Sequence, residues 1–263
     1  MTGIGIGAGL GVLVSSAVFE YSPLTLSTRF NQVGVGDNET VSHNNHANFH
    51  INAQLPKTVG CWYKCASDIT ERVLLSKFDS LSSSGWFLSV FTNDLWYFHI
   101  RQQANWISKA LDAPVGVDGA WHSVIATYSG SQTAAGQTIY IDGVAPPQSN
   151  FNAGVPTNFA TAEPFKVSGV GNAGVQVNDW TGYACHEFII AEELTPAEVL
   201  LIGGQGVPTH IINALPTRTV LHWDTLGDGN AVGGGGYLDI SGNGLHGTYL
   251  NGDAGDIQGD VPP

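Results

Sequence analysis

Aromatic side chains gather in one short stretch of the chain, where they could bind a sugar. Trp86, Trp96 and Trp106, with Tyr97 beside the second of them, all fall between residues 85 and 108. An aromatic ring offers a flat apolar face that can stack on another ring without a charged partner. The sequence therefore predicts these four residues as candidates for glycan binding. The alternative is that the same rings fill the core, because large apolar side chains are mostly buried.

Oxygen-bearing side chains near the C-terminus could bind calcium. Asp228 and Asn230 flank a glycine, and Asp239 precedes the sequence Ser-Gly-Asn-Gly. Calcium prefers carboxylate and amide oxygens, although the spacing here is not that of a complete calcium-binding loop. Tight turns also prefer Asp and Asn, so turn formation explains these residues equally well. We expect a protein that needs no cofactor, with calcium at these positions as the alternative.

Catalysis and nucleic-acid binding find little support in the sequence. A retaining glycosidase needs two carboxyl groups about 5 Å apart, and no Glu-x-Asp-x-x-Glu run is present to supply them from one strand. The Gly-x-Ser-x-Gly sequence of a serine hydrolase is also absent. The formal net charge of −13, with only nine Lys and Arg residues, disfavours a phosphate-rich partner. We therefore expect a binding or structural protein, not an enzyme.

Short runs of alternating residues recur along the chain and predict the strands that must position these side chains. The predicted strands cover residues 24–30, 57–65, 72–78, 85–91, 94–101, 121–128, 137–142, 165–170 and 183–191. Strands at this spacing are typical of a β sandwich. One short helix is predicted near residues 195–203. Thr195, Pro196 and Glu198 form a capping box with proline at the first helical position, and Gly203-Gly204 would end the helix.

The segment from Gly119 to Gly143 gives the strongest indication of the fold. It contains Trp-His-Ser-Val-Ile-Ala-Thr-Tyr, then a polar loop, then Ile-Tyr-Ile-Asp-Gly, and its final Asp142-Gly143 favours a tight hairpin. This pattern resembles the concanavalin-A-like jelly rolls of the laminin-G-like and pentraxin superfamily. The resemblance implies an all-β fold, a two-sheet antiparallel jelly-roll sandwich. In His186-Glu187-Phe-Ile-Ile, however, a histidine stands where the family often has an acid, which argues against calcium at that position.

The first 22 residues form a separate segment. Glycine alternates with apolar residues at Gly3, Gly5, Gly7, Gly9 and Gly11, unlike a dinucleotide-binding loop. We expect an extended assembly arm, because glycines let another backbone approach closely. A targeting segment is the alternative, and so many glycines make a poor membrane-spanning helix. This opening is also similar to the starts of many tailed-phage structural proteins.

Residues 206–263 form a predicted extension that packs on the jelly-roll domain, residues 23–205, or on a neighbouring subunit. The extension contains Gly-Asp-Gly and Asp-Ile-Ser-Gly-Asn-Gly sequences, which look like segments found beside such domains in phage and marine metagenomic proteins. This resemblance implies a virion structural protein: a capsid-decoration, fibre-like or tail-associated subunit. Its partners would be other virion proteins, copies of itself, with a trimer as one candidate, and host-surface glycans. The alternative is a secreted bacterial carbohydrate-binding, lectin-like module.

The three cysteines are predicted to be small buried residues. Cys61 and Cys65 are four residues apart on one predicted strand, roughly 13 Å between Cα atoms, which is too far for a disulfide. A bridge from Cys185 to one of them stays open. The spacing does not match a metal site, so the sequence favours free thiols in a reducing cytosol.

Overall fold

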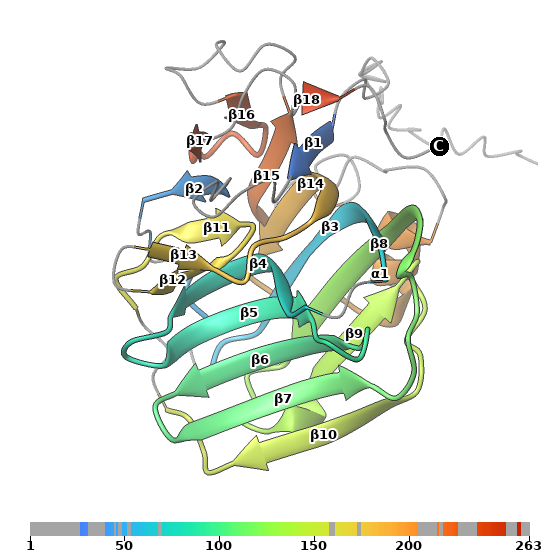
Figure 1. Cartoon of the computed structure of the whole chain (residues 1–263). Helices are drawn as coiled ribbons and strands as arrows, with labels where there is room; N and C mark the ends of the chain where they lie inside the picture. The colour runs from blue at the N-terminus through green and yellow to red at the C-terminus, as the bar shows by residue number, and fades with distance from the viewer. Residues whose placement is uncertain are drawn as a thin grey trace, which may run out of the picture.

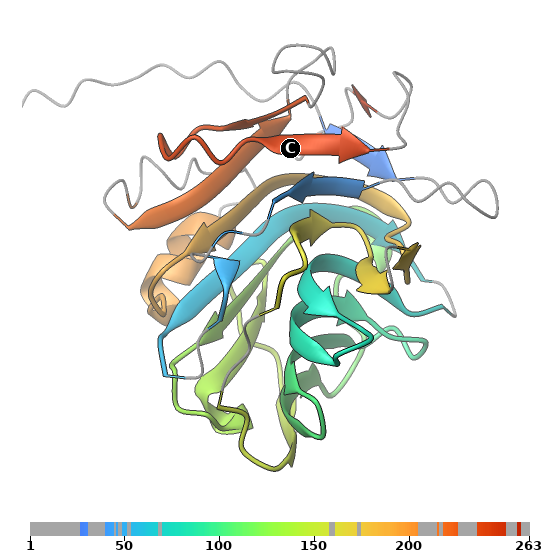
Figure 2. The same cartoon turned by 90° about the vertical axis from the view of Figure 1, so that its left-hand side faces the viewer.

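The computed structural model describes residues 27–30, 40–44, 46, 49–51, 54–67, 70–157, 161–172, 175–204, 215, 218–225, 236–250 and 257–258. The arm predicted for residues 1–22, with its glycines Gly3, Gly5, Gly7, Gly9 and Gly11, lies outside these residues. Asp228 and Asn230 also lie outside them. The described chain folds into two β-sheets that face each other across a common core (Figures 1 and 2).

The front sheet of Figure 1 is built from consecutive antiparallel strands. These are β4 (Arg72–Asp79), β5 (Ser84–Val90), β6 (Trp96–Gln102) and β7 (Asn105–Leu111), with β10 (Gln148–Ala153) beside β7 at the edge. Beyond β4 the sheet continues through β11 (Phe165–Val167), β2 (Thr40–His43), β17 (Gly247–Leu250) and β16 (Gly236–Asp239). The short strands β12 (Val170–Asn172) and β13 (Val175–Val177) pair with each other beside β4.

The back sheet is antiparallel and carries the segment that first indicated the fold. Its order is β9 (Gln137–Ile141), β8 (Asp118–Tyr128), β3 (Lys57–Ala66), β14 (Gly182–Ile190), β1 (Ser27–Phe30) and β18 (Ile257–Gln258). A short 3-10 turn, η2 (Ala134–Gly136), precedes β9. The strand β15 (Thr219–Thr225) pairs with β14 in this sheet and with β16 in the front sheet. The predicted all-β jelly-roll sandwich is confirmed.

Several strands of the front sheet were not among the predicted runs, and the residues of two of them, β10 and β7, explain why. β10 has the polar sequence Gln-Ser-Asn-Phe-Asn-Ala and is largely exposed, because it lies at a sheet edge. In β7 a serine and a lysine, Ser108 and Lys109, interrupt the apolar pattern. Pairing with β6 therefore determines that β7 is a strand, more than its own side chains do.

The alternation of side chains along β5 and β6 places two predicted glycan residues in the core. Trp86 and Trp96 are both 0% exposed, and the register pairs Val90 with Trp96, so that Trp86, Val90 and Trp96 point to the same inner face. The indole Nε1 of Trp86 donates a hydrogen bond of 2.8 Å to the carbonyl of Phe49. The prediction that Trp86 and Trp96 stack on a glycan is therefore wrong, since both rings pack between the sheets.

The predicted helix is present as α1 (Pro196–Gly203). The Thr195 hydroxyl accepts a hydrogen bond from the backbone N–H of Glu198, and the Glu198 carboxylate accepts one of 2.8 Å from the N–H of Thr195. These two bonds complete the predicted capping box. Val199 and Ile202 pack against the outer face of the back sheet, so α1 covers part of that face.

Strands of the predicted C-terminal extension belong to the two sheets. β15 and β16 pair with each other, and β17 pairs with β2. Trp223 of β15 is 0% exposed, and its Nε1 donates a hydrogen bond of 2.6 Å to the carbonyl of Leu245. Burying this side chain joins the described part of the extension to the main core. The boundary at residue 205 stays a prediction.

The cysteines are buried free thiols, as the sequence predicts. Burial raises the pKa of Cys65 to about 12 and raises that of Cys61 well above its ordinary value. Both thiols therefore stay protonated and unreactive at neutral pH. Separately, no helix in the described part of the chain is long and apolar enough to span a membrane.

Candidate binding site

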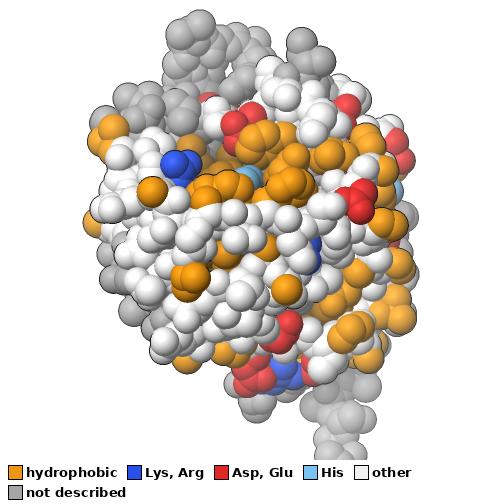
Figure 3. Space-filling view, turned by 90° about the horizontal axis from the view of Figure 1, so that it is seen from below, with side chains coloured by type: hydrophobic (Ala, Val, Ile, Leu, Met, Phe, Trp, Pro, Cys, Tyr) orange, Lys and Arg blue, Asp and Glu red, His pale blue; other side chains and the backbone are white. Residues whose placement is uncertain are grey.

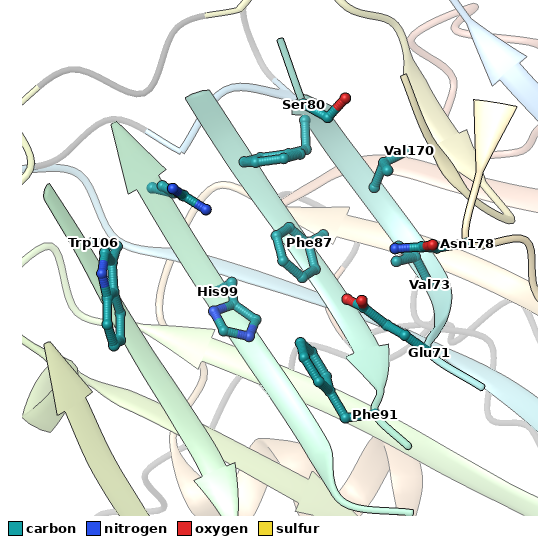
Figure 4. A pocket seen from close by; sticks show the side chains of 11 residues that line it. Glu71, Val73, Ser80, Phe87, Phe91, His99, Trp106, Val170 and Asn178 are labelled. Atoms are coloured by element: carbon teal, nitrogen blue, oxygen red, sulfur yellow. The ribbon is translucent and has the colours of Figure 1, made fainter. Parts of the chain in front are cut away.

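A groove lies on the outer face of the front sheet, on the side turned away from the core. It has a volume of about 510 Å³ and crosses strands β4 to β7 (Figure 4). A band of hydrophobic side chains, with a histidine among them, is visible in the space-filling view (Figure 3). The groove is lined by Glu71, Val73, Phe78, Ser80, Phe87, Phe91, His99, Arg101, Trp106, Val170 and Asn178.

Aromatic rings form the floor of the groove. Phe87 of β5 stacks on His99 of β6, with ring centres 4.6 Å apart and planes at 27°. Phe91 lies 5.5 Å from the same imidazole and 4.5 Å from the ring of Tyr97. Trp106 of β7 stands on the other side of His99 in Figure 4. The floor is thus a set of flat rings from three neighbouring strands, which suits stacking against a ring of a ligand.

His99 is a neutral imidazole among these rings. Burial of the ring, and to a smaller extent the nearby Arg101 guanidinium, lowers the pKa of His99 to about 4. Its Nε2 atom is shielded from solvent and has no hydrogen-bond partner among the described residues. A buried polar atom without a partner costs free energy, and a ligand hydroxyl could supply the missing bond.

Polar side chains stand at the rim. Glu71 and Asn178 lie across the floor from Trp106 (Figure 4). Burial raises the pKa of Glu71 above its ordinary value. The backbone carbonyl of Asn178 accepts a hydrogen bond of 2.8 Å from the N–H of Val73, which fixes Asn178 beside β4. On β6, the Nε of Arg101 donates to the carbonyl of Gln103 at 2.9 Å. The rim therefore offers donors and acceptors around an apolar floor.

The structure divides the predicted glycan residues between the two faces of the front sheet. Trp106 lines the groove, and Tyr97 is half-buried on the same face, where its ring stacks on that of His99 at 5.5 Å. Trp86 and Trp96 face the core instead. Glycan binding by Trp106, which lines the groove, and by Tyr97, which lies on the same face, stays a prediction.

Most of the residues that line the groove were not predicted from the sequence. Phe87 and His99 could have been found from alternation, because each lies between two residues of a strongly apolar inner face. Glu71 and Asn178 carry no such signal. They are far apart in the chain and meet only because β13 returns beside β4.

Asp239, a predicted metal ligand, accepts backbone hydrogen bonds from its own turn and from the neighbouring strand β15. Its Oδ1 accepts from the N–H groups of Ser241 at 2.9 Å and His222 at 3.2 Å, and its Oδ2 accepts from that of Leu245 at 2.9 Å. This is the turn role that the sequence left open as the alternative. Within the described ranges, no three His, Cys, Asp or Glu side chains are grouped to hold a metal ion. Calcium at Asp228 and Asn230 stays a prediction.

A second group of titratable side chains forms where β8 meets the turn after β9. We call Asp118, His122, Ser123, Asp142 and Gly143 the hairpin corner. The His122 Nδ1 lies 2.7 Å from Asp142 Oδ2, and its Nε2 lies 3.0 Å from Asp118 Oδ1. The hydrogen bond to Asp142 is the largest cause that raises the pKa of His122 to about 9. The imidazole is therefore protonated at neutral pH and donates to both carboxylates.

The hairpin corner also shows why the Trp-His and Asp-Gly sequences occur together. Asp142 Oδ1 accepts a 2.9 Å hydrogen bond from the N–H of Ser123, so the turn is tied to β8. Asp142 and Gly143 have φ values of 50° and 75°, and the N–H of Val144 donates to the carbonyl of Ile141 at 3.0 Å. These are the features of the tight hairpin turn that the sequence predicts.

Comparisons with known proteins agree with this architecture. The family described as the concanavalin A-like lectin/glucanases superfamily matches residues 11–200. No curated protein sequence matches the chain.

Three solved structures share the fold at low sequence identity. A protein from Bacteroides ovatus that is described as carbohydrate-binding is 13% identical, with a TM-score of 0.58 over 87% of this chain and 59% of that one. This chain thus spans about three fifths of that relative. The CBM40 domain of the Ruminococcus gnavus IT-sialidase, bound to α2,3-sialyllactose, is 12% identical, with a TM-score of 0.50 over 68% of this chain and 96% of that one. The binding domain of Paraclostridial Mosquitocidal Protein 1 has the same identity and score, over 66% and 42% of the two chains.

Proposed function

We propose that this chain, which belongs to the concanavalin A-like lectin/glucanases superfamily, binds carbohydrate in the groove of its front sheet. The observation that carries the proposal is the floor of the groove. There, Phe87, Phe91, Trp106 and the neutral imidazole of His99 present flat faces within one cavity. A sugar ring has an apolar face that stacks on such rings and hydroxyl groups that need polar partners.

The dimensions and the rim of the groove suit an oligosaccharide. Its volume of about 510 Å³ lies within the range of small-molecule sites, roughly 300 to 1,000 Å³. Glu71, Asn178 and Arg101 are placed around the floor to bond hydroxyl groups at the edges of the sugar. The structures described as carbohydrate-binding and as bound to sialyllactose share this fold, which supports the same class of ligand.

The groove is better suited to binding than to hydrolysis. A glycosidase of the usual kind needs a pair of carboxyl groups on either side of the scissile bond. Among the described residues that line the groove, Glu71 is the one that carries a carboxyl group. We therefore propose a lectin-like module that holds a glycan without cleaving it.

The proposal is tested by removing the ring of Trp106 and measuring binding on a glycan array. Trp106→Ala should abolish the signal, because loss of one stacking ring removes the face on which the sugar lies. Its melting temperature should change little, since Trp106 is only half-buried. The matched control is Trp106→Phe, which keeps a ring and should retain binding. An unchanged array signal for Trp106→Ala contradicts the proposal.

The biological setting, a virion subunit or a secreted module, stays a prediction. The likeness of the N-terminal and C-terminal sequences to phage proteins supports the virion setting. In that setting, residues 1–22 act as an assembly arm and the groove faces the host glycans. Light scattering of the full chain beside a chain lacking residues 1–22 tests this role. Discrete oligomers for the full chain alone support the arm; identical monomers favour the secreted module.

A further inference from the structure

The groove of the front sheet has an apolar corner at one end. Val73 and Phe78 of β4 and Val170 of β12 form a hydrophobic cluster separate from the main core, and all three line the groove. We call these three residues the apolar corner. Phe87 packs against the corner and also stacks on His99, so it joins the corner to the aromatic floor. The side chains of the corner can contact an apolar group of a ligand, but they cannot bond a hydroxyl group.

Two polar side chains flank the apolar corner. Glu71 precedes Val73 by two positions in the chain and lines the same groove. The backbone of Asn178 is fixed beside Val73 by the 2.8 Å hydrogen bond from the Val73 N–H. Figure 4 shows Glu71, Val73 and Asn178 together, across the floor from Trp106. The corner and its two polar neighbours therefore form one end of the groove.

The polar groups of Glu71 and Asn178 are available to a ligand. The Glu71 carboxylate and the Asn178 side-chain amide make no hydrogen bond or ion pair with the described residues. Asn178 is exposed, and its backbone φ of 57° is uncommon for a residue other than glycine. Such backbone conformations occur often at ligand-binding sites. The carboxylate accepts hydrogen bonds, whereas the amide also donates them. This end of the groove thus offers an acceptor, a donor and an apolar surface.

An acetamido group matches these three features together. Its methyl group is apolar, its N–H donates a hydrogen bond and its carbonyl oxygen accepts one. The methyl group can lie in the apolar corner while the N–H donates to Glu71 and the carbonyl accepts from the Asn178 amide. A hydroxyl group would leave the corner without an apolar partner. A free amino group is charged, and an ammonium ion beside the apolar corner would lose hydration that its surroundings replace only in part.

We propose that the groove selects an N-acetylhexosamine. Phe87 lies between Val73 and His99 in Figure 4, so a sugar ring that stacks on Phe87 can place its acetamido group in the apolar corner. A hydroxyl group of the same sugar can then bond to His99, whose Nε2 has no partner among the described residues. The inference rests on the carbohydrate binding proposed above and adds the substituent that the groove prefers.

The test measures Kd by NMR titration of the full chain with three matched sets of sugars. The sets are glucose, glucosamine and N-acetylglucosamine, and the corresponding galactose and mannose compounds. In at least one set the N-acetyl sugar should bind about tenfold tighter than the other two, because it adds an apolar methyl contact and a charge-assisted hydrogen bond. If no set shows this preference, or if none of the sugars binds, the inference is overturned. The glycan array with Trp106→Ala then decides separately whether carbohydrate binding itself stands.

Removing the Asn178 side chain tests whether the preference arises at this end of the groove. Asn178→Gly keeps the positive φ and the backbone bond to Val73, so the fold should be retained. It should raise the Kd of the preferred N-acetyl sugar about fivefold or more and leave that of the corresponding hexose unchanged. Gln103→Gly is the matched control, because Gln103 is exposed, has a φ of 54° and does not line the groove. It should leave both Kd values unchanged. An equal change for both sugars in Asn178→Gly, or no change, would overturn the assignment, and circular dichroism shows whether each variant is folded.

Discussion

The groove and the hairpin corner use the same kinds of side chain in opposite ways. In the hairpin corner, His122 lies between two carboxylates, and Asp142 accepts a further bond from the backbone of Ser123. In the groove, His99 lies among aromatic rings, and its Nε2 has no hydrogen-bond partner among the described residues. One histidine is protonated at neutral pH and the other is neutral.

This difference separates residues that hold the fold from residues that are available to a ligand. The polar groups of the hairpin corner bind one another, so they have little capacity left for a partner. The groove keeps an unsatisfied nitrogen and exposed ring faces, which cost the folded chain some stability. The Trp-His and Asp-Gly sequences, which are the most recognisable part of the chain, therefore report the fold and not the site.

Replacing Asp142 should give the largest loss of stability and is the strongest test of the hairpin corner. Asp142→Ala removes the acceptor of the Ser123 N–H and the partner of His122, and it leaves alanine at a φ of 50°. We expect the free energy of unfolding to fall by roughly 2 to 3 kcal/mol. Urea denaturation measures this change.

Asp142→Asn is the matched control for that experiment. Asparagine keeps the side-chain oxygen for Ser123 and tolerates a positive φ, but it turns an NH2 group to His122 in place of the carboxylate oxygen. It should therefore cost less than alanine does, about 1 to 2 kcal/mol. If the alanine variant is as stable as the native chain, the hairpin corner does not hold the turn, and the contrast with the groove fails.

The two histidines should change stability with pH in opposite directions. The folded-state pKa of His122 is about 9, above its ordinary value of 6.5. Its contribution to stability is therefore complete below pH 6.5 and is lost as the pH rises to 9. The folded-state pKa of His99 is about 4. Between pH 4 and 6.5 the His99 imidazole binds a proton more readily in the unfolded chain than in the folded one. The contribution of His99 to the stability of the fold therefore rises as the pH rises through that range.

Urea midpoints from pH 4 to 9 separate the two effects. The native chain is compared with His122→Gln and with His99→Gln. The stability difference between the native chain and His122→Gln should shrink above pH 6.5. The difference between the native chain and His99→Gln should change only below pH 6.5. Solvent screens the exposed Asp118 and Asp142, so the effect of His122 should be smaller than that of removing the Asp142 side chain. Differences that do not vary with pH would remove the distinction between the two histidines.

Local sequence rules predicted the elements whose partners are close in the chain. The capping box of α1 and the turn at Asp142-Gly143 need only a few neighbouring residues, and both are present. The residues that line the groove come from β4 to β7 and the positions next to these strands, from β12, and from the segment after β13. These residues come together because of the order of the strands in the sheet, and a local sequence pattern does not predict that order.

The tryptophans show where residue type alone misleads. Trp86 and Trp106 are both tryptophans of the front sheet, yet Trp86 is 0% exposed and Trp106 lines the groove. Successive side chains of a strand point to opposite faces, so the odd or even position of a residue along its strand decides whether its side chain faces the core or the surface. That parity could have been read from β5, where Trp86 alternates with Phe87, but not from β7, whose strand was not predicted. Burial of Trp86 and Trp96 was thus within reach of the sequence, and the role of Glu71 was not.

Replacing His99 should give the smallest change in stability and the clearest division between fold and ligand binding. In His99→Phe a ring remains to stack on Phe87 and Phe91, while the nitrogen without a partner is removed. The free energy of unfolding should change by less than about 1 kcal/mol, because an apolar ring replaces a neutral one of similar shape. Glycan affinity should fall about tenfold, since a hydroxyl group loses its partner in the groove. Calorimetry and urea denaturation on the same preparation measure both quantities. A loss of stability equal to that of Asp142→Ala would mean that His99 serves packing as His122 serves the turn, and the groove would then have no polar atom kept for a ligand at its floor.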